Sequence, residues 1–375
     1  MVIEEKKSYF EGLNTLKFFT ALLVLLDHAR QNLAQYKIYD YSQFTIFHKG
    51  KFGVNFFFVL SGFLLTYLAI QEHKKFGNID IKNFYLRRIF RIFPLYYMSV
   101  FLGYMTLAVI YPLIKGQTYL SFSIQEGLIY HLLLLPNYVI VLYPIESIGA
   151  LYSLWSIGVE EQFYLIFPVF MYFCLKSRHI VRYLMVAAVC VFLLYHLIIH
   201  TDILTTNIIV KRFVWTLRFY MMLIGGSWAA VLFFYKDKIK KIIENKIFQI
   251  SVWILLFYLI FYPTDEVFNA AHSVFLGLVL IIISQKKTII NVEKKPFIYL
   301  GTISFGIYIY HPYVSYFLRF VMEKSSFIMH SIVLFPFLYY IAELLLTIFI
   351  AHFSYKYYEL YFLKLKSRYM RKKLS

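Results

Sequence analysis

Charged residues are scarce in this chain of 375 residues, of which only 15% are Asp, Glu, Lys or Arg. Apolar and aromatic residues make up 61% of it, whereas a typical soluble domain is close to half apolar and about a quarter charged. Apolar surface in this excess requires lipid as its solvent, and the mean hydropathy of +0.65 agrees. The composition therefore excludes a soluble cytosolic enzyme and a disordered chain.

Cysteine is almost absent as well. The two cysteines, Cys174 and Cys190, both lie inside apolar runs, which excludes a disulfide scaffold and a cysteine metal site. No small-residue cleavage site follows the first apolar run, Phe18 to Leu26, so we expect this run to be the first span and not a signal peptide. The chain also lacks a Pro/Gly/Ser-rich linker and a fixed-period repeat. We therefore expect a single integral membrane domain over residues 1–375, with no fused soluble domain.

Ten apolar segments come close to the length of about 20 residues that a membrane-spanning helix needs. They lie near residues 9–28, 52–70, 91–113, 152–174, 180–199, 213–235, 247–263, 267–284, 298–320 and 328–353. An eleventh stretch, 128–143, is shorter and contains His131, Pro136 and Asn137. We interpret it as a re-entrant or interfacial element.

The distribution of Lys and Arg supports ten spans with both termini in the cytoplasm. In that arrangement the cytoplasmic segments carry 27 of the 38 basic residues, and the outer segments and span ends carry 9. Counting 128–143 as a span would reverse every later loop and remove this asymmetry. We therefore predict an all-α, polytopic helix bundle with about ten transmembrane helices in the cell (plasma or inner) membrane. The net charge of +18 then faces anionic lipid, and no nucleic acid partner is expected.

Ionisable side chains inside the predicted spans are the candidate functional residues, because a charge in the bilayer is costly. Lys17 and His28 are eleven residues apart, which places them on one face of a helix, about 16 Å apart along its axis. Glu160 is predicted at the depth of His28, where a carboxylate can fix the tautomer of an imidazole and raise its basicity. His28 could instead be an interfacial histidine at the end of a span. One of the adjacent glutamates, Glu161 in particular, could simply face water.

Three further polar residues in the spans have structural alternatives of equal or greater weight. Ser61 is most simply a helix-packing contact, Arg218 could extend to the outer headgroups, and His311, beside Pro312, could cap a kinked helix.

A basic run begins the third predicted span on the cytoplasmic side. It contains Arg87, Arg88 and Arg91, and guanidinium groups match the geometry of phosphate. The neighbouring aromatic residues favour a flat, anionic ligand such as a nucleotide. A simple positive-inside anchor is the alternative.

Six short motifs occur in order along the chain. They are Leu13 to His28 with its Lys17-x10-His28 spacing, Phe52 to Phe63, Arg87 to Pro94, Trp155 to Pro168, Ile303 to Pro312 and Tyr357 to Glu359. Together they resemble the acyltransferase 3 family of integral membrane acyltransferases. Asn14 and Asn55 stand where the family commonly has Asp, and Lys17 where Arg is commoner. These departures argue against a proton relay through the asparagines and favour a pocket held by amide hydrogen bonds.

The resemblance implies an acyl-CoA-dependent O-acyltransferase, usually an O-acetyltransferase, that acylates hydroxyls of cell-envelope glycans. Acyl-CoA, most simply acetyl-CoA, is then a co-substrate, no cofactor or metal is bound, and the acceptor is a glycan or lipid-linked saccharide. Only sixteen residues follow Glu359, so we expect no extra hydrolase-like domain there. We assign catalysis to His28 and Glu160, donor binding to Lys17, Arg87, Arg88 and Arg91, and the pocket to Asn55, Ser61, Trp155, Ser156, Arg218 and His311.

The expected mechanism begins with the nucleotide held at the arginine run while the pantetheine arm threads between the helices. His28 acts as general base towards the acceptor hydroxyl and Glu160 stabilises the imidazolium. An acyl-enzyme intermediate on His28 is the rival mechanism. A transporter for an envelope precursor or acyl donor, and a receptor with a degenerate site, are the competing functions. The sequence leaves the acceptor, the acyl chain length and the oligomeric state open.

Overall fold

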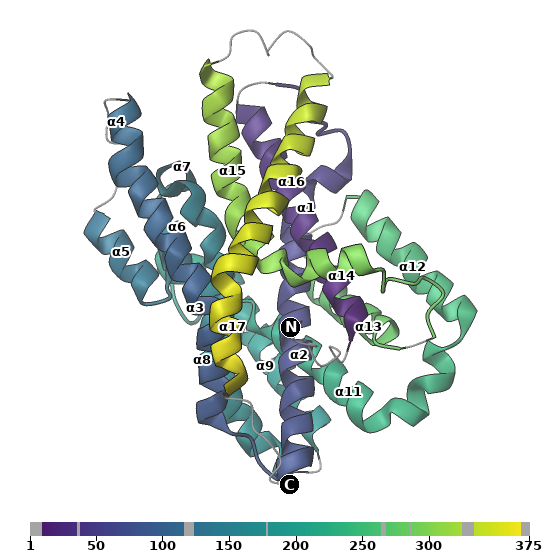
Figure 1. Ribbon diagram of the computed structural model, residues 1–375. Coiled ribbons are helices and arrows are strands. Elements are labelled where there is room, and N and C mark those ends of the chain that lie inside the picture. The colour runs from purple at the N-terminus through teal and green to yellow at the C-terminus, as the bar shows by residue number, and fades with distance from the viewer. Residues whose placement is uncertain are drawn as a thin grey trace.

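The computed structural model describes residues 10–35, 38–115, 124–177, 179–263, 268–285, 287–324 and 334–368. Over these ranges the chain is built from helices joined by short connections, and it contains no strand. The predicted all-α architecture is confirmed (Figure 1).

Most of the chain lies in long helices. These are α1 (Glu11–Gln35), α2 (Gly50–Phe76), α3 (Ile81–Met105), α8 (Trp155–Cys174), α9 (Ile180–His200), α11 (Phe219–Ile243), α12 (Lys246–Phe261), α13 (Asn269–Ile283), α15 (Ser304–Lys324) and α16 (Leu334–Ser354). Short helices connect them: α4 (Tyr111–Lys115), α5 (Ile124–Leu132), α6 (Pro136–Leu142), α7 (Ile145–Ile148), α10 (Ile208–Thr216), α14 (Lys295–Thr302) and α17 (Leu360–Arg368). Single turns of 3₁₀ helix, η1 (Thr45–His48) and η3 (Gly149–Leu154), precede α2 and α8, and π-helical turns follow α3 and α16.

The described part of the chain contains six helical stretches long and apolar enough to cross a membrane, so the chain is a multi-pass membrane protein. They are Gly50–Phe76, Ile81–Leu113, Gly149–Cys174, Ile180–His200, Ile208–Ile243 and Phe335–Leu365. The helices α12 and α13 are apolar but shorter. The count of ten spans and the side on which each terminus lies stay predictions.

Two predicted spans are interrupted. The segment 213–235 changes direction at Leu217 and Arg218, which separate α10 from α11, and the segment 298–320 is divided at Ile303 between α14 and α15. In Figure 1, α14 lies across the bundle while α15 runs along it. The stretch 128–143 forms the short helices α5 and α6, with a proline in the first turn of α6, so neither is long enough to span.

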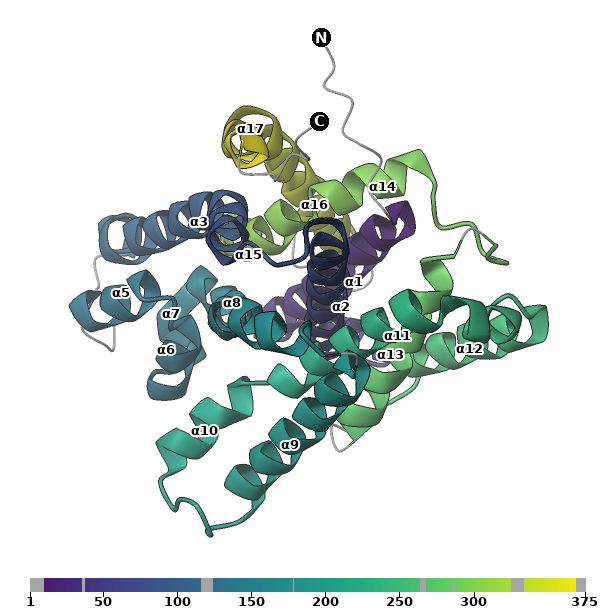
Figure 2. The same ribbon diagram turned by 90° about the horizontal axis from the view of Figure 1, so that it is seen from below.

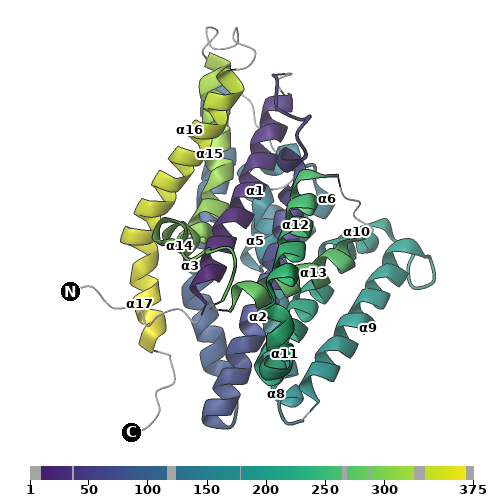
Figure 3. The same ribbon diagram turned by 90° about the vertical axis from the view of Figure 1, so that its right-hand side faces the viewer.

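The helices α1 and α2 occupy the middle of the bundle, as Figure 2 shows in a view along the helices. Figures 2 and 3 both place α9 at the edge of the molecule. Only 17% of its most apolar stretch of 18 residues is buried. A central helix meets other helices on most sides and can carry polar groups that a lipid-facing helix cannot. The polar residues of α1 are therefore compatible with a membrane position.

Glycines allow α2 and α11 to pack backbone against backbone. A Cβ atom built on Gly62 would lie 1.8 Å from the carbonyl oxygen of Met222, and one on Gly225 would lie 2.0 Å from that of Val59. Any larger side chain would push the two helices apart, as expected for membrane helices that pack through small residues. This contact fixes α2, which carries Asn55 and Ser61, relative to the first turns of α11.

A tight turn joins α2 to α3 and positions the arginine run. The helix α2 ends at Gly77, which adopts a φ of 79°, a value that favours glycine. The Asp80 side chain then caps α3 by accepting a hydrogen bond from the backbone N–H of Asn83 at 3.0 Å. The arginines follow within the first three turns of α3.

Candidate active site

Two histidines from distant parts of the sequence meet at the centre of the candidate site. Nδ1 of His28, on α1, lies 2.8 Å from Nε2 of His311, on α15. His311 is buried with 1% of its surface exposed, and its Nδ1 lies 3.3 Å from the carbonyl oxygen of Ile307. The pair was not predicted, since His311 was assigned only to the pocket.

The hydrogen bonds assign the tautomers of this pair. A carbonyl oxygen can only accept, so in neutral His311 the proton lies on Nδ1 and Nε2 is an acceptor. Nδ1 of His28 must then donate to it, which leaves the lone pair of His28 on Nε2. No hydrogen bond from the described residues occupies this Nε2, and the side chain is only half-buried. The arrangement therefore presents a base, held in one tautomer.

Glu160 does not contact His28, contrary to the expected pairing. Its carboxylate accepts hydrogen bonds from Ser61, at 3.1 Å, and from the hydroxyl of Tyr164, at 2.6 Å. The carboxylate that acts electrostatically on His28 belongs to Asp27, which is ion-paired with Arg30 at 3.0 Å. The difference arises because the rotation of α8 about its axis turns Glu160 towards α2 and α3.

The neighbouring Glu161 is also placed differently from expectation. It was predicted to face water, but it is buried with 5% of its surface exposed, and its Oε1 has no hydrogen-bond partner among the described residues. It interacts electrostatically with Glu160 and Arg88. Both glutamates therefore face the helix interface that holds the arginine run.

Three of the four predicted donor-binding cations gather in one place. Arg88 and Arg91 both interact electrostatically with Lys17, although they are far from it in sequence, and with Glu160. The Lys17 ammonium donates to Asn14 Oδ1 at 3.0 Å, one of the amide contacts expected where the family commonly has Asp. Because Lys17 and His28 share α1, this cluster lies about 16 Å along the helix from the histidine pair.

Arg87 and Arg88 have different surroundings. Arg87 forms an ion pair with Glu72 at 2.8 Å, across the turn between α2 and α3. The guanidinium of Arg88 lies over the rings of Phe84 and Tyr164, with 5.8 and 5.5 Å to the centroids, and its buried Nε has no hydrogen-bond partner in the described part of the chain. Arg88 therefore has a buried donor without a partner in the described part of the chain, whereas the charge of Arg87 is already paired with a carboxylate.

The start of α8 packs against the histidine pair through Tyr308. The Tyr308 hydroxyl donates to the carbonyl oxygen of Ser153 at 3.1 Å, and Ser156 Oγ, 2.7 Å away, therefore donates to Tyr308. The ring of Tyr308 lies 5.7 Å from that of His311. Trp155 is buried, with its ring edge-on to Phe58 at 6.1 Å. These contacts make the predicted Trp155-Ser156 pair part of the wall beside the histidines.

Amide hydrogen bonds hold the remaining predicted pocket residues. Arg218 Nη1 donates to Asn55 Oδ1 at 2.6 Å, and Asn55 Nδ2 donates to Asn269 Oδ1 at 3.0 Å. Arg218 is 2% exposed, so it does not extend to the headgroups, which was the alternative for this residue. It is held inside by the break between α10 and α11.

Sequence reasoning missed several neighbours of the site. Tyr164 is four residues after Glu160, and Tyr308 three residues before His311, spacings that place them on the same helix faces. Asn269, by contrast, comes from the start of α13 and no sequence signal links it to Asn55. Polar residues one helical turn from each candidate were therefore detectable, and partners on other helices were not.

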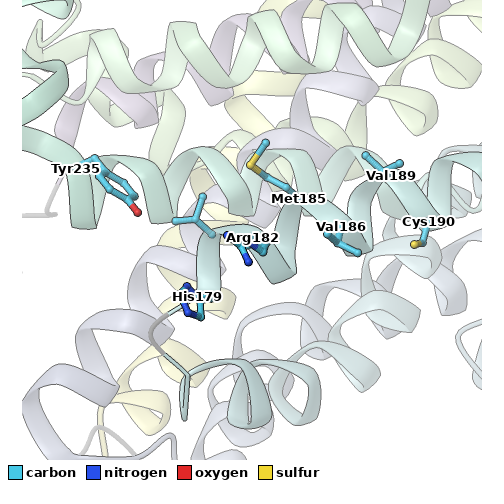
Figure 4. Close-up of a pocket in the computed structure, with 8 residues that line it drawn as sticks. His179, Arg182, Met185, Val186, Val189, Cys190 and Tyr235 are labelled. Carbon is cyan, nitrogen blue, oxygen red and sulfur yellow. The ribbon is translucent and has the colours of Figure 1, made fainter.

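A surface pocket on α9 and α11 lies apart from this site. It is lined by His179, Arg182, Met185 and Tyr235 among others (Figure 4). It shares no residue with the histidine pair or the cation cluster, and it opens on the exposed edge of the bundle. We assign it no part in the chemistry.

Comparison with known proteins identifies the family. A sequence model described as an acyltransferase domain matches residues 10–355, which leaves out the closing motif Tyr357 to Glu359. The O-acetyltransferase OatA of Staphylococcus aureus is 27% identical over 374 residues, covering 94% of this chain and 57% of that protein. The putative peptidoglycan O-acetyltransferase YrhL of Bacillus subtilis is 29% identical over 179 residues, covering 45% of this chain and 25% of that protein. A putative O-acetyltransferase of S. aureus, SACOL0978, is 24% identical over 380 residues.

The chain thus spans less than two thirds of the length of these relatives. No solved structure matches it. The family match covers nearly all of the helices described above, including both histidines and the arginine run. The chain belongs to the acyltransferase 3 family of integral membrane acyltransferases.

Proposed function

We propose that the protein is an O-acetyltransferase of the plasma membrane that moves an acetyl group from cytoplasmic acetyl-CoA to a hydroxyl of a cell-wall glycan on the outer side. The family and the names of its relatives support an O-acyltransferase of this kind. The observation that carries the proposal is the pairing of His28 with His311. His28 shares α1 with Lys17 of the cation cluster, which lies about 16 Å away along that helix.

In this mechanism the phosphates of the donor bind Lys17, Arg88 and Arg91. The flexible pantetheine arm then follows α1 towards His28. Charge-assisted hydrogen bonds from arginine suit phosphate. The nucleotide therefore stays on the cytoplasmic side while the thioester reaches the histidine pair, and no large movement of the charged donor across the membrane is needed.

At the histidine pair, Nε2 of His28 takes the proton from the acceptor hydroxyl as its oxygen attacks the thioester carbon. The carbon–sulfur bond breaks, and the proton passes from His28 to the leaving thiolate, which departs as the CoA thiol. His311 holds His28 in the required tautomer, and Asp27 stabilises the transient imidazolium, the role first given to Glu160. Glu160 instead acts as a counter-ion within the cation cluster. An acyl group held on His28 is the alternative route.

The test is transfer of radiolabelled acetyl groups from acetyl-CoA to a glycan panel by the purified protein in detergent. The wild-type protein should label a glycan covalently, and His28→Ala should lower the rate at least 100-fold while donor binding stays intact. Label that crosses a liposome membrane without covalent transfer would favour a transporter. Activity of His28→Ala within a few-fold of wild type would contradict the role given to His28.

A further inference from the structure

Arg218 is a buried cation that pairs with no carboxylate of the described residues. It lies at the break between α10 and α11 with 2% of its surface exposed. No carboxylate of the described residues lies within ion-pair distance of its guanidinium, and its buried Nε has no hydrogen-bond partner among them. A buried charge without a counter-ion is costly, and such groups in membrane proteins usually serve a ligand.

The contacts that hold Arg218 orient it without neutralising it. Asn55 Oδ1 accepts a hydrogen bond from Arg218 Nη1 at 2.6 Å. The Asn55 amide nitrogen in turn donates a hydrogen bond to Asn269. The ring of Trp215 lies 4.8 Å from the guanidinium carbon and 5.8 Å from the ammonium of Lys51. Two cations therefore lie over one partly exposed aromatic ring, an arrangement that suits an anionic group attached to a ring that can stack.

Arg218 lies on the side of the bundle that holds the histidine pair. Arg218 interacts electrostatically with Tyr152, whose ring lies 6.1 Å from that of His28. Asp27, which also acts electrostatically on Tyr152, is already ion-paired with Arg30. An anion bound at Arg218 would thus lie on the side of Tyr152, the ring that neighbours His28.

We propose that Arg218, with Trp215 and Lys51, is a subsite for an oxyanion of the acceptor, so that this protein acetylates an anionic saccharide. This inference rests on the proposed function, since it names the class of acceptor. The oxyanion is a carboxylate of an acidic sugar or the phosphate of a lipid-linked sugar, which share the bidentate chemistry that arginine recognises. Binding there positions the acceptor hydroxyl at Nε2 of His28.

Asn55→Asp tests the subsite with almost no change of shape. A carboxylate in place of the amide oxygen that Arg218 now contacts would neutralise the guanidinium inside the protein. Asn207→Asp is the matched control, because Asn207 is an exposed N-cap of α10, a position where Asp serves equally well. Three acceptors are compared: a carboxylated disaccharide, its neutral amide and a saccharide phosphate.

The wild-type protein should use at least one anionic acceptor with a KM about tenfold lower than that of the amide. Asn55→Asp should remove this preference and Asn207→Asp should keep it. The acceptor that loses its advantage in Asn55→Asp shows whether the subsite binds a sugar carboxylate or a sugar phosphate. Equal KM values for charged and neutral acceptors in the wild-type protein, or the same loss in both variants, would overturn the inference while acetyl transfer stands.

If no acceptor is acetylated, the proposed function fails and the subsite is tested on its own. Calorimetric titration of the same saccharides into wild-type and Asn55→Asp protein then decides. Tighter binding of an anionic saccharide to the wild-type protein supports the site, and equal or absent binding overturns it.

Discussion

At the scale of single residues, the proposed chemistry depends on which nitrogen of His28 carries its proton. His311 determines this, because its own Nδ1 is committed to the carbonyl oxygen of Ile307 at 3.3 Å. In many enzymes a carboxylate orients the base. Here a second imidazole occupies that position, and a carboxylate, Asp27, acts on His28 from the same helix.

His311→Gln should therefore retain more activity than His311→Leu. A glutamine can still accept the hydrogen bond from His28 Nδ1, whereas leucine cannot, and the leucine variant should lose about 100-fold in kcat with little change in donor KM. Steady-state kinetics of both variants check this. Equal kcat values for the two variants would show that His311 only fills space.

The arginines of α3 should differ in their effect on the donor. Arg88→Ala should raise the apparent KM for acetyl-CoA roughly tenfold or more, because each charge-assisted contact to phosphate is worth about 1.5–3 kcal/mol. Arg88→Lys should recover only part of this, since it keeps the charge and loses the planar fork.

Arg87→Ala is the matched comparison, because Glu72 already pairs with Arg87 at 2.8 Å. It should raise the donor KM less than Arg88→Ala. The values are normalised to correctly inserted protein. If Arg88→Ala instead shows altered insertion with a normal donor KM, and Arg88→Lys restores insertion fully, the arginines only anchor α3 on the positive side.

At the scale of helices, α15 and α16 are joined by a buried polar contact. Ser315 donates a hydrogen bond to Glu343, which is completely buried and whose Oε2 has no partner among the described residues. Thr347, one turn further along α16, also carries a buried hydroxyl without a partner there. The pairing of these helices matters for the site because α15 carries His311.

Ser315→Ala should lower the stability of the protein in detergent by about 1–2 kcal/mol, because it removes the hydrogen bond that Ser315 donates to the buried Glu343 carboxyl group. Ser315→Ala combined with Glu343→Leu should recover most of the loss, since both polar groups are then removed together. Thermal unfolding of the single and double variants measures this. A double variant less stable than Ser315→Ala would show that Glu343 has another essential partner.

At the scale of the whole molecule, we predict the orientation in the membrane from the charge asymmetry of 27 to 9 basic residues. The turn between α2 and α3 and the helix α17 lie towards one end of the bundle. The last turn of α15 and the first turn of α16 lie at the other end (Figure 1). The arrangement is compatible with a cytoplasmic end that carries the arginine run.

Cysteines introduced at Lys240 and Ser367 should react only with reagents on the cytoplasmic side. One at Ser325, which lies outside the described residues, should react only from the outer side. The background is Cys190→Ala, because Cys190 is the exposed native cysteine. Labelling of position 325 from the cytoplasm would contradict the ten-span arrangement and require that the 128–143 stretch crosses the membrane.

The sequence by itself determined the class of protein and its family, and it predicted most members of the candidate site. Composition required a membrane, because this much apolar surface has no other solvent. The Lys17-x10-His28 spacing placed a cation and a base on one helix face through the geometry of the helix alone. The asparagine contacts expected at positions 14 and 55 are found.

Only the tertiary structure decided which of these residues touch. The partner of His28 proved to be His311 and not Glu160, Glu161 proved to be buried, and Arg218 proved to lie at a helix break. Each outcome depends on the rotation of a helix about its axis or on the neighbour it packs against. Periodicity shows which residues of a helix share a face, but the helix that this face meets is set by packing among all the elements.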